Sequence, residues 1–141
     1  MKLKFKKTVE NAKVPTLSQG KTPAFELYAI LDEDKVLFPG DIKLFRTGIA
    51  FSMEEREFPD MSAMILPPEE LVREKGIYLA NNIALIGGDY KGEITVALIN
   101  NSKVMRTISD GEKIARLIVT RVQVPTVTAG QPEQETPGVT S

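Results

Sequence analysis

The stretch GIYLANNIALIGGDYKGEITVALINN, residues 76–101, constrains the fold more than any other part of the chain. In its second half Ile94, Val96 and Leu98 recur at every second position, which is the period of a β-strand with one buried face. An alternating segment precedes it, and Gly-Gly-Asp-Tyr at 87–90 is a turn signal between the two. The pattern predicts two strands joined as a β-hairpin or a β-arch.

Other parts of the chain favour further short strands. A strand is expected around Leu3 and Phe5, a second over 25–29, a third over 61–66, and a buried strand over 114–124. Turn signals occur at Pro39-Gly40 and around Gly48. The sequence therefore predicts an all-β, jelly-roll-like barrel.

One short helix is expected near 69–75. Proline tolerates the first turn of a helix, and Glu69 and Glu70 suit the positive N-terminal end of its dipole. Gly76 is placed to end it.

Length and composition favour a single domain. The chain has 141 residues, 42% of them hydrophobic, which is enough for one core. We expect a basic N-terminal arm or strand at 1–13, a β domain at 14–124, and an extended Pro/Thr-rich tail at 125–141 that cannot build a core of its own.

The residue inventory narrows the chemistry. The net charge of −1 gives no general electrostatic reason to expect nucleic acid or an anionic membrane as partner. Without cysteine and histidine, catalysis would depend on carboxylates, Lys, Arg, Tyr, Ser or Thr, while the redox compartment stays open. No signal peptide or membrane span is visible, so synthesis in a cytoplasm is expected.

The 76–101 stretch resembles the third motif of the homotrimeric dUTPase family, and the spacing matches without a gap. Weaker resemblances to the first, second and fourth motifs extend the similarity over about 14–119, and a viral or phage origin is one expectation. The matching positions are mostly turn and core residues, among which we single out Pro39, Gly40, Gly48, Pro67, Gly76, Asn81, Gly92 and Gly111 as defining the fold. The resemblance implies a homotrimer.

The departures from the family pattern fall where the family does its chemistry. The resemblance implies that Gly87 replaces the water-activating aspartate and that Ala84 replaces a glycine beside the uracil. The departures from the family pattern also include Glu26, Pro68, Glu69, Glu70 and Arg116. In addition, the tail lacks the arginine and phenylalanine of the family's fifth motif. Carboxylates at 69 and 70 would repel a triphosphate unless a metal bridged them.

These departures favour a non-catalytic structural or interaction protein on a trimeric dUTPase-like scaffold. A decoration or cement protein of a virus capsid, located in the virion and bound to the shell through the N-terminal arm and the tail, is the specific expectation. It needs no cofactor and has no catalytic residue.

The alternative is a divergent dUTP diphosphatase that hydrolyses dUTP to dUMP and pyrophosphate. Asp89 would then replace the missing base, Glu26 would assist magnesium, and Tyr90 would back the sugar. A nucleotide-binding regulatory homologue, or a relative of the dCTP deaminases, is a third possibility, and Glu93 does not discriminate between those families.

Overall fold

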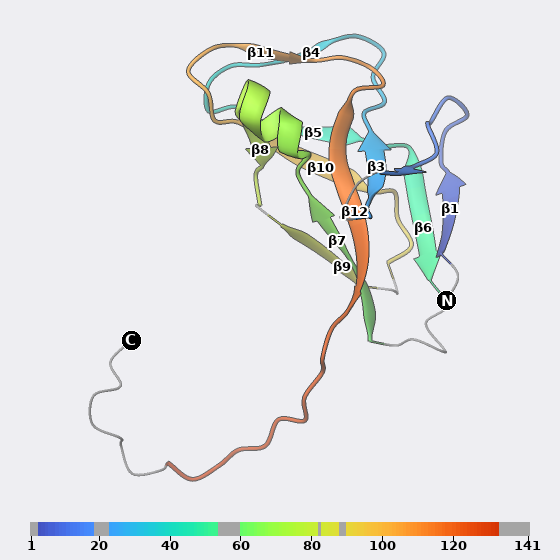
Figure 1. Cartoon of the computed structure of the whole chain (residues 1–141), viewed down its shortest axis with the longest axis vertical. Coiled ribbons are helices and arrows are strands. Elements are labelled where there is room, and N and C mark those ends of the chain that lie inside the picture. The colour runs from blue at the N-terminus through green and yellow to red at the C-terminus, as the bar shows by residue number, and fades with distance from the viewer. Residues whose placement is uncertain (1–2, 19–22, 54–59, 82, 88–89, 133–141) are drawn as a thin grey trace.

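The computed structural model describes residues 3–18, 23–53, 60–81, 83–87 and 90–132. These residues form short antiparallel strands and a helical segment around a shared core (Figure 1), which confirms the all-β, jelly-roll-like class. In chain order the elements are β1 (Leu3–Lys7), β2 (Thr16–Leu17), β3 (Phe25–Tyr28), β4 (Lys35–Leu37), β5 (Ile42–Arg46), β6 (Ile49–Met53), β7 (Met61–Leu66), η1 (Leu71–Lys75), β8 (Ile77–Leu79), β9 (Ala84–Gly87), β10 (Thr95–Asn100), β11 (Arg106–Ile108) and β12 (Lys113–Arg121).

The largest sheet has the order β2-β3-β12-β7-β9, with the longest strand, β12, at its centre. β12 pairs with β7 in unbroken antiparallel register from Arg116 opposite Leu66 to Arg121 opposite Met61. β9 forms the edge of this sheet through its pairing with β7.

A β-bulge interrupts the pairing of β12 with β3. Lys113 pairs with Tyr28, but the next pair along the strand is Ala115 with Leu27. In a regular strand, residues three apart point to opposite faces, whereas an extra residue shifts the alternation by one. The bulge therefore places Lys113 and Arg116 on the same face of the sheet.

The two strands of the 76–101 stretch belong to different sheets. β9 pairs with β7, while β10 pairs with β5 and β8 in the order β5-β10-β8. Of the two predicted connections, the structure forms the β-arch and not the hairpin. The remaining strands pair as β1 with β6 and as β11 with β4.

The core lies where the inward faces of these sheets meet. Leu27, Phe45, Leu98 and Leu117 are each at most 1% exposed, as expected from the alternating pattern of their strands. Asn100 is a fully buried polar residue whose amide nitrogen donates to the carbonyls of Leu37 and Val104 at 2.9 and 2.8 Å. These two bonds satisfy the donors of the buried side-chain amide.

The N-terminal strand packs against the body of the fold. The Phe5 ring meets the Phe25 ring edge to face, with 5.2 Å between centroids. Gly48 has a φ of +66°, and a Cβ there would lie 2.7 Å from the Cβ of Ala12 and 2.9 Å from a methyl group of Val9. Only glycine therefore combines this backbone conformation with so close an approach of the arm.

The predicted helix is a single helical segment whose last turn is wide. It has a π-type turn at η1, and Gly76 ends it in the left-handed conformation, with φ +65°. The structure thus confirms a helix ending at Gly76.

Beyond β12 the chain leaves the body as an extended segment (Figure 1). The described part, to residue 132, has no strand or helix, and the side chains of Val124 and Val127 are 76% and 88% exposed. None of the described helical residues forms a segment long and apolar enough to cross a membrane.

Candidate functional site

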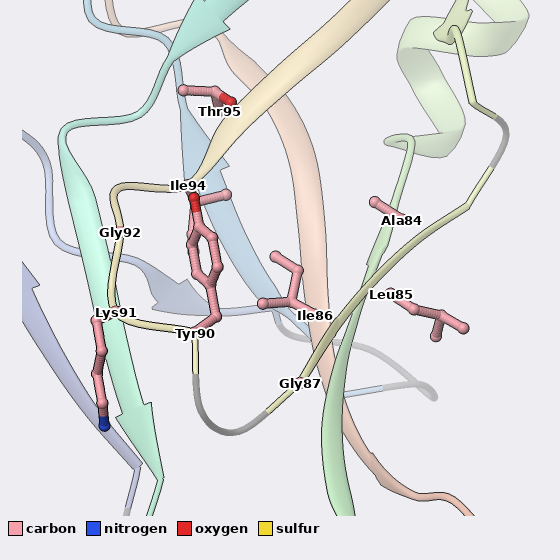
Figure 2. A pocket seen from close by; sticks show the side chains of 9 residues that line it. All are labelled: Ala84, Leu85, Ile86, Gly87, Tyr90, Lys91, Gly92, Ile94 and Thr95. Atoms are coloured by element: carbon pink, nitrogen blue, oxygen red, sulfur yellow. The ribbon is translucent and has the colours of Figure 1, made fainter.

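A pocket of about 610 Å³ lies in the bend of the β-arch, and we call it the arch pocket. In Figure 2 the Tyr90 ring and the Ile86 side chain face one another across it, whereas Leu85 and Lys91 point away. Its walls are largely backbone and apolar side chains, contributed by Ala84, Leu85, Ile86, Gly87, Tyr90, Lys91, Gly92, Ile94 and Thr95. A concave apolar site with a few polar groups is typical of small-molecule binding.

Tyr90 is held in place by the chain that follows it. Its hydroxyl donates to the backbone carbonyl of Glu93 at 2.9 Å. The ring covers Gly92, where a Cβ would lie 2.8 Å from the Tyr90 hydroxyl oxygen. A side chain at position 92 would therefore displace the ring that forms one wall of the pocket.

The side chain of Glu93 ties the base of the arch to the rest of the fold. Arg46 donates to it through two nitrogens, at 2.9 and 2.8 Å, and the Thr8 hydroxyl donates to the same carboxylate. Hydrogen bonds from Arg46 lower the pKa of the Glu93 carboxyl, and Thr8 contributes further, while burial opposes them in part. The carboxylate is therefore held in its charged form as a structural anchor at the base of the arch.

Thr47 secures the same region from the core side. This residue is 1% exposed, and its hydroxyl donates to the carbonyl of Ile94 at 2.7 Å. The predicted turn around Gly48 thus supports the floor of the arch pocket.

The pocket lacks a carboxylate at the position where the resemblance places one. Gly87 lies at the exposed end of β9, and Ala84 adds a half-buried methyl group at its start. Asp89, the predicted replacement base, lies outside the described residues. Tyr90 lines the pocket, and its role behind the sugar stays a prediction, whereas Glu26 is in a different part of the sheet.

Glu26 belongs to a second group of charged residues, which we call the Lys113 cluster: Glu26, Glu70, Lys113 and Arg116. The ammonium of Lys113 lies 3.0 Å from the Glu70 carboxylate and 3.5 Å from that of Glu26. The hydrogen bond that Lys113 donates to Glu70 raises the pKa of Lys113. The pKa of Glu70 is lowered by a hydrogen bond from its own backbone and then by the bond from Lys113.

This pairing corrects the expected electrostatics of the 67–70 segment. The sequence predicts that Glu70 repels a triphosphate, but in the structure Lys113 neutralises it, and Arg116 lies close enough to stabilise its charge further. Glu69 is exposed at the start of the helical segment, where its charge is solvated. Two carboxylates and two cations leave the Lys113 cluster without net charge.

Two polar atoms of the cluster remain without a partner. Glu26 Oε2 and Arg116 Nε are both buried, and neither has a hydrogen bond within the described part of the chain. The described residues contain no group of three or more Asp, Glu, His or Cys side chains that could hold a metal ion.

Sequence reasoning missed Lys113, Arg46 and the anchoring role of Glu93. Lys113 is 43 residues from Glu70, and Arg46 is 47 residues from Glu93. No local spacing indicates such pairs, because they exist only after the strands have been placed side by side.

The other predicted residues lie in turns and connections. Gly40 and Gly111 adopt positive φ, Pro39 precedes Gly40 in its turn, and Pro67 follows β7. Asn81 is exposed, with its carbonyl accepting a hydrogen bond from the Ile83 amide at 2.6 Å.

Solved structures of phage dUTPases share the fold. A point mutant of the dUTPase from phage phi11 of Staphylococcus aureus aligns with a TM-score of 0.80 over 96% of this chain and 100% of that chain, at 16% sequence identity. A point mutant of the dUTPase from Staphylococcus bacteriophage 80alpha, bound to dUpNHpp, aligns with a TM-score of 0.81 over 97% of this chain and 92% of that chain, at 14% identity.

Bacterial proteins are more similar in sequence. A deoxyuridine 5'-triphosphate nucleotidohydrolase of Thermoanaerobacter sp. (strain X514) is 34% identical over 137 residues, covering 95% of this chain and 89% of the relative. The protein of the same name from Pseudomonas putida (strain W619) is 40% identical over 109 residues, covering 75% and 70%. That from Xylella fastidiosa (strain M12) is 37% identical, covering 75% of this chain and 66% of its own length.

These relatives overturn the expected function. Comparing single positions of this chain with the family's motifs led to the expectation of a non-catalytic capsid protein. That expectation is wrong, because these bacterial relatives are named as enzymes and match most of the chain. The physical reason is that charge at a site is set by neighbours in space, as at Glu70 and Lys113, and cannot be judged from isolated positions. The dUTPase family model matches residues 10–138, and the chain belongs to the dUTPase family.

Proposed function

We propose that the protein is a dUTP diphosphatase, which hydrolyses dUTP to dUMP and pyrophosphate. The observation that carries the proposal is the arch pocket, formed by the same stretch that resembles the family's third motif. The names of the bacterial relatives support the substrate.

The arch pocket suits a pyrimidine nucleoside. β9 is an edge strand of its sheet, so the peptide groups on its outer edge have no strand partner within the described chain. Such groups alternate N–H donors with C=O acceptors, and they can pair with the acceptor and donor edge of a uracil. Tyr90 and Ile86 supply flat and apolar walls for the sugar and base.

Hydrolysis requires a water molecule to attack the α-phosphorus. A bond forms from the water oxygen to phosphorus, the bond from phosphorus to the β-phosphate oxygen breaks, and a carboxylate takes the proton of the water. Because position 87 is glycine, we assign the proton acceptor to Asp89, two residues further along the arch. A base two residues away in sequence from the position that the resemblance assigns to it predicts a slow enzyme.

Magnesium is the cofactor that the family implies, and the related phage phi11 dUTPase coordinates a structural Mg(II) ion. Mg²⁺ commonly binds one or two carboxylates together with substrate phosphates. Glu26 fits this need in part, because its buried Oε2 has no partner among the described residues. When bound, the ion would neutralise charge on the triphosphate, with Glu26 as its protein ligand.

A homotrimer is consistent with the family, and we propose it for this chain. The outward face of β5 supports it, because Ile42 and Leu44 are 59% and 65% exposed and lie beside the half-exposed Ile99 and Ala97 of β10. An apolar sheet face of this kind is typical of a subunit contact. Light scattering after gel filtration would give the mass of three chains, whereas a monomer would contradict the proposal.

A second candidate is a regulatory homologue that binds the nucleotide without turning it over. Gly87 favours it, because the position that the resemblance assigns to the base carries no side chain. This candidate and the enzyme share the binding step and differ only in the chemical step.

The deciding experiment measures pyrophosphate released from dUTP with magnesium, together with calorimetric binding of the non-hydrolysable analogue dUpNHpp. The enzyme predicts release above the blank that Asp89→Ala abolishes and that the exposed-site control Asp34→Ala leaves unchanged. Binding of the analogue without release would favour the regulatory candidate. If neither binding nor release occurs, both are wrong.

A further inference from the structure

Three large apolar side chains gather at one end of the ribbon formed by β4 and β11, and we call them the tip patch: Phe38, Val104 and Met105. Each of the three is more than half exposed. Within the ribbon Arg106 pairs with Leu37, and the same register, continued by one residue, sets Met105 opposite Phe38. Residues opposite one another point to the same face of an antiparallel pair. Because Leu37 is buried, Phe38 and Met105 share the outward face.

The buried Asn100 holds together the two turns that carry the tip patch. Its side-chain amide donates to the carbonyls of Leu37 and Val104 at 2.9 and 2.8 Å. Its backbone amide donates to the carbonyl of Asp41 at 3.1 Å, and the Asp41 carboxylate accepts a hydrogen bond from the Phe38 amide at 2.8 Å. The patch is therefore presented on a fixed backbone, so little conformational entropy is lost when a partner binds it.

The tip patch is separate from the regions that have been given a role above. None of its residues lines the arch pocket. The outward face of β5, which we propose as a subunit contact, belongs to a different sheet from the ribbon. In Figure 1 the ribbon lies at the end of the body opposite to the one from which the tail leaves. A rigid group of exposed apolar side chains with no role inside the fold indicates an interaction surface.

The surroundings of the tip patch are positively charged. The two segments that form this end, 36–43 and 103–108, carry three cations and one carboxylate. The cations are Lys43, Lys103 and Arg106, and the carboxylate is that of Asp41. None of these cations forms an ion pair within the described residues. The acidic run 32–34 lies beyond the other end of the ribbon. A partner that combines carboxylates with apolar side chains therefore complements the patch.

A membrane surface is the other partner that apolar side chains beside cations could suit. Recognition of anionic lipid typically uses clusters of about four to eight Lys or Arg side chains. Here Lys103 is the exposed one among the three cations of this end, and the other two are half-buried. An aromatic residue beside a methionine is instead typical of the centre of a protein interface. The composition of the patch thus favours a protein partner over a membrane.

We propose that the tip patch is a docking site for a partner protein, which it recognises through a short segment that combines apolar side chains with Asp or Glu. Phe38 and Met105 contact the apolar side chains of that segment, and Lys103 attracts its carboxylates. This inference goes beyond the proposed hydrolysis and does not depend on it, because the patch and the arch pocket share no residue.

The test selects binders from a displayed library of random short peptides, with the full-length protein immobilised. The strongest binder is then synthesised, and its dissociation constant is measured by fluorescence anisotropy at low salt. The double variant Phe38→Ser/Met105→Ser removes the apolar face, and Lys103→Glu reverses the exposed charge. Matched controls are Val127→Ser, at an 88% exposed position in the tail, and Lys6→Glu, at an exposed position on β1. All variants are first compared by thermal unfolding.

We expect the wild type to select peptides in which aromatic or aliphatic residues stand beside Asp or Glu. The double variant should weaken binding of the synthesised peptide by about 10- to 100-fold, as for loss of the central anchors of an interface. Lys103→Glu should weaken it by about 3- to 10-fold, and by less as salt rises, because salt screens the attraction. Both controls should bind as the wild type does. Deoxyuridine binding should be the same in every variant, since none of the substituted residues lines the arch pocket.

Several results would overturn the inference. One is a selection that yields no peptide whose binding depends on the tip patch, and another is selected peptides without acidic residues. Loss of the trimer in the double variant, measured by light scattering, would assign the patch to a subunit contact. Patch-dependent binding to vesicles of equal phosphatidylserine and phosphatidylcholine would assign it to a membrane. Patch-dependent binding of a synthetic peptide of residues 122–141 would assign it to the chain's own tail.

Discussion

The arch pocket and the Lys113 cluster are built in opposite ways. The pocket is formed mainly by backbone and apolar side chains, within a segment that is continuous in sequence from Ala84 to Thr95. The cluster consists of charged side chains from β3, β12 and the helical segment. Contiguous backbone keeps its shape when single side chains change, whereas a charged cluster must change as a set, because one unpaired buried charge is strongly destabilising.

This contrast explains why the departures from the family pattern have different meanings in the two regions. In the pocket, Gly87 removes a side chain and nothing among the described residues replaces it. In the cluster, the carboxylate of Glu70 is matched by Lys113. The arch pocket has lost a side chain, whereas in the Lys113 cluster the added negative charge is paired with a lysine.

The largest expected effect comes from restoring the lost group. Gly87→Asp places a carboxylate at the exposed end of β9. We expect pyrophosphate release from dUTP to increase by about 10²- to 10⁴-fold, the usual contribution of a positioned base. Steady-state kinetics with Gly87→Asn as the uncharged control would measure it. An unchanged rate would show that a rebuilt site already supplies its base elsewhere.

A smaller effect is expected from the anchor beneath the pocket. Glu93→Gln removes the charge that accepts two hydrogen bonds from Arg46, and because the Arg46 side chain is 57% exposed we expect a loss of only about 1 kcal/mol of unfolding free energy at pH 7. Urea unfolding would measure it. Glu70→Gln is the matched control in the cluster, where the 48% exposed carboxylate should cost less than about 1 kcal/mol.

The stability lost in Glu93→Gln is also expected to depend on pH. The pKa of Glu93 is lower in the folded protein than its ordinary value of 4.5, so the folded state favours the charged form. Its contribution is complete above the ordinary pKa and disappears as the pH falls through the lowered pKa. The stability difference between wild type and Glu93→Gln should therefore vanish in acid. A difference that persists there would assign the loss to packing.

The smallest expected effect concerns the wall of the pocket. Gly92→Ala places a Cβ 2.8 Å from the Tyr90 hydroxyl oxygen, which must then give up its bond to the Glu93 carbonyl. Loss of one neutral hydrogen bond predicts deoxyuridine affinity about 3- to 10-fold lower. Calorimetry would measure it, with Gly130→Ala in the extended tail as control, where a Cβ meets nothing within 4 Å. Unchanged affinity would mean that the Tyr90 wall does not touch the nucleoside.

Much of the fold could be predicted because its signals are local. The alternation of Ile94, Val96 and Leu98 indicates a buried face directly, and all three are at most 2% exposed. β7 coincides with the predicted strand over 61–66, and Gly76 ends the helical segment as expected. Each of these features depends on residues within a few positions of one another.

The candidate site was predictable only where it follows the chain. Tyr90 lies in the stretch that forms the pocket, but the charge balance of the cluster differs from the prediction. Glu69 is the neighbour of Glu70 in sequence, although the partner of Glu70 in space is Lys113. The sequence also leaves open whether the 76–101 stretch forms a hairpin or an arch. The connecting turn does not reveal whether its two strands pair with each other or with strands of two different sheets.

The sequence by itself determined several of the strands, the main turns and the family of this protein, because residue periodicity and glycine positions act locally. Only the tertiary structure decided that the central stretch is an arch, that Glu93 is held by Arg46, and that a bulge brings Lys113 and Arg116 to one face. The physical reason is that register and side-chain charge pairing depend on strands that are distant in sequence. A one-residue shift in that register reverses which face every following side chain occupies.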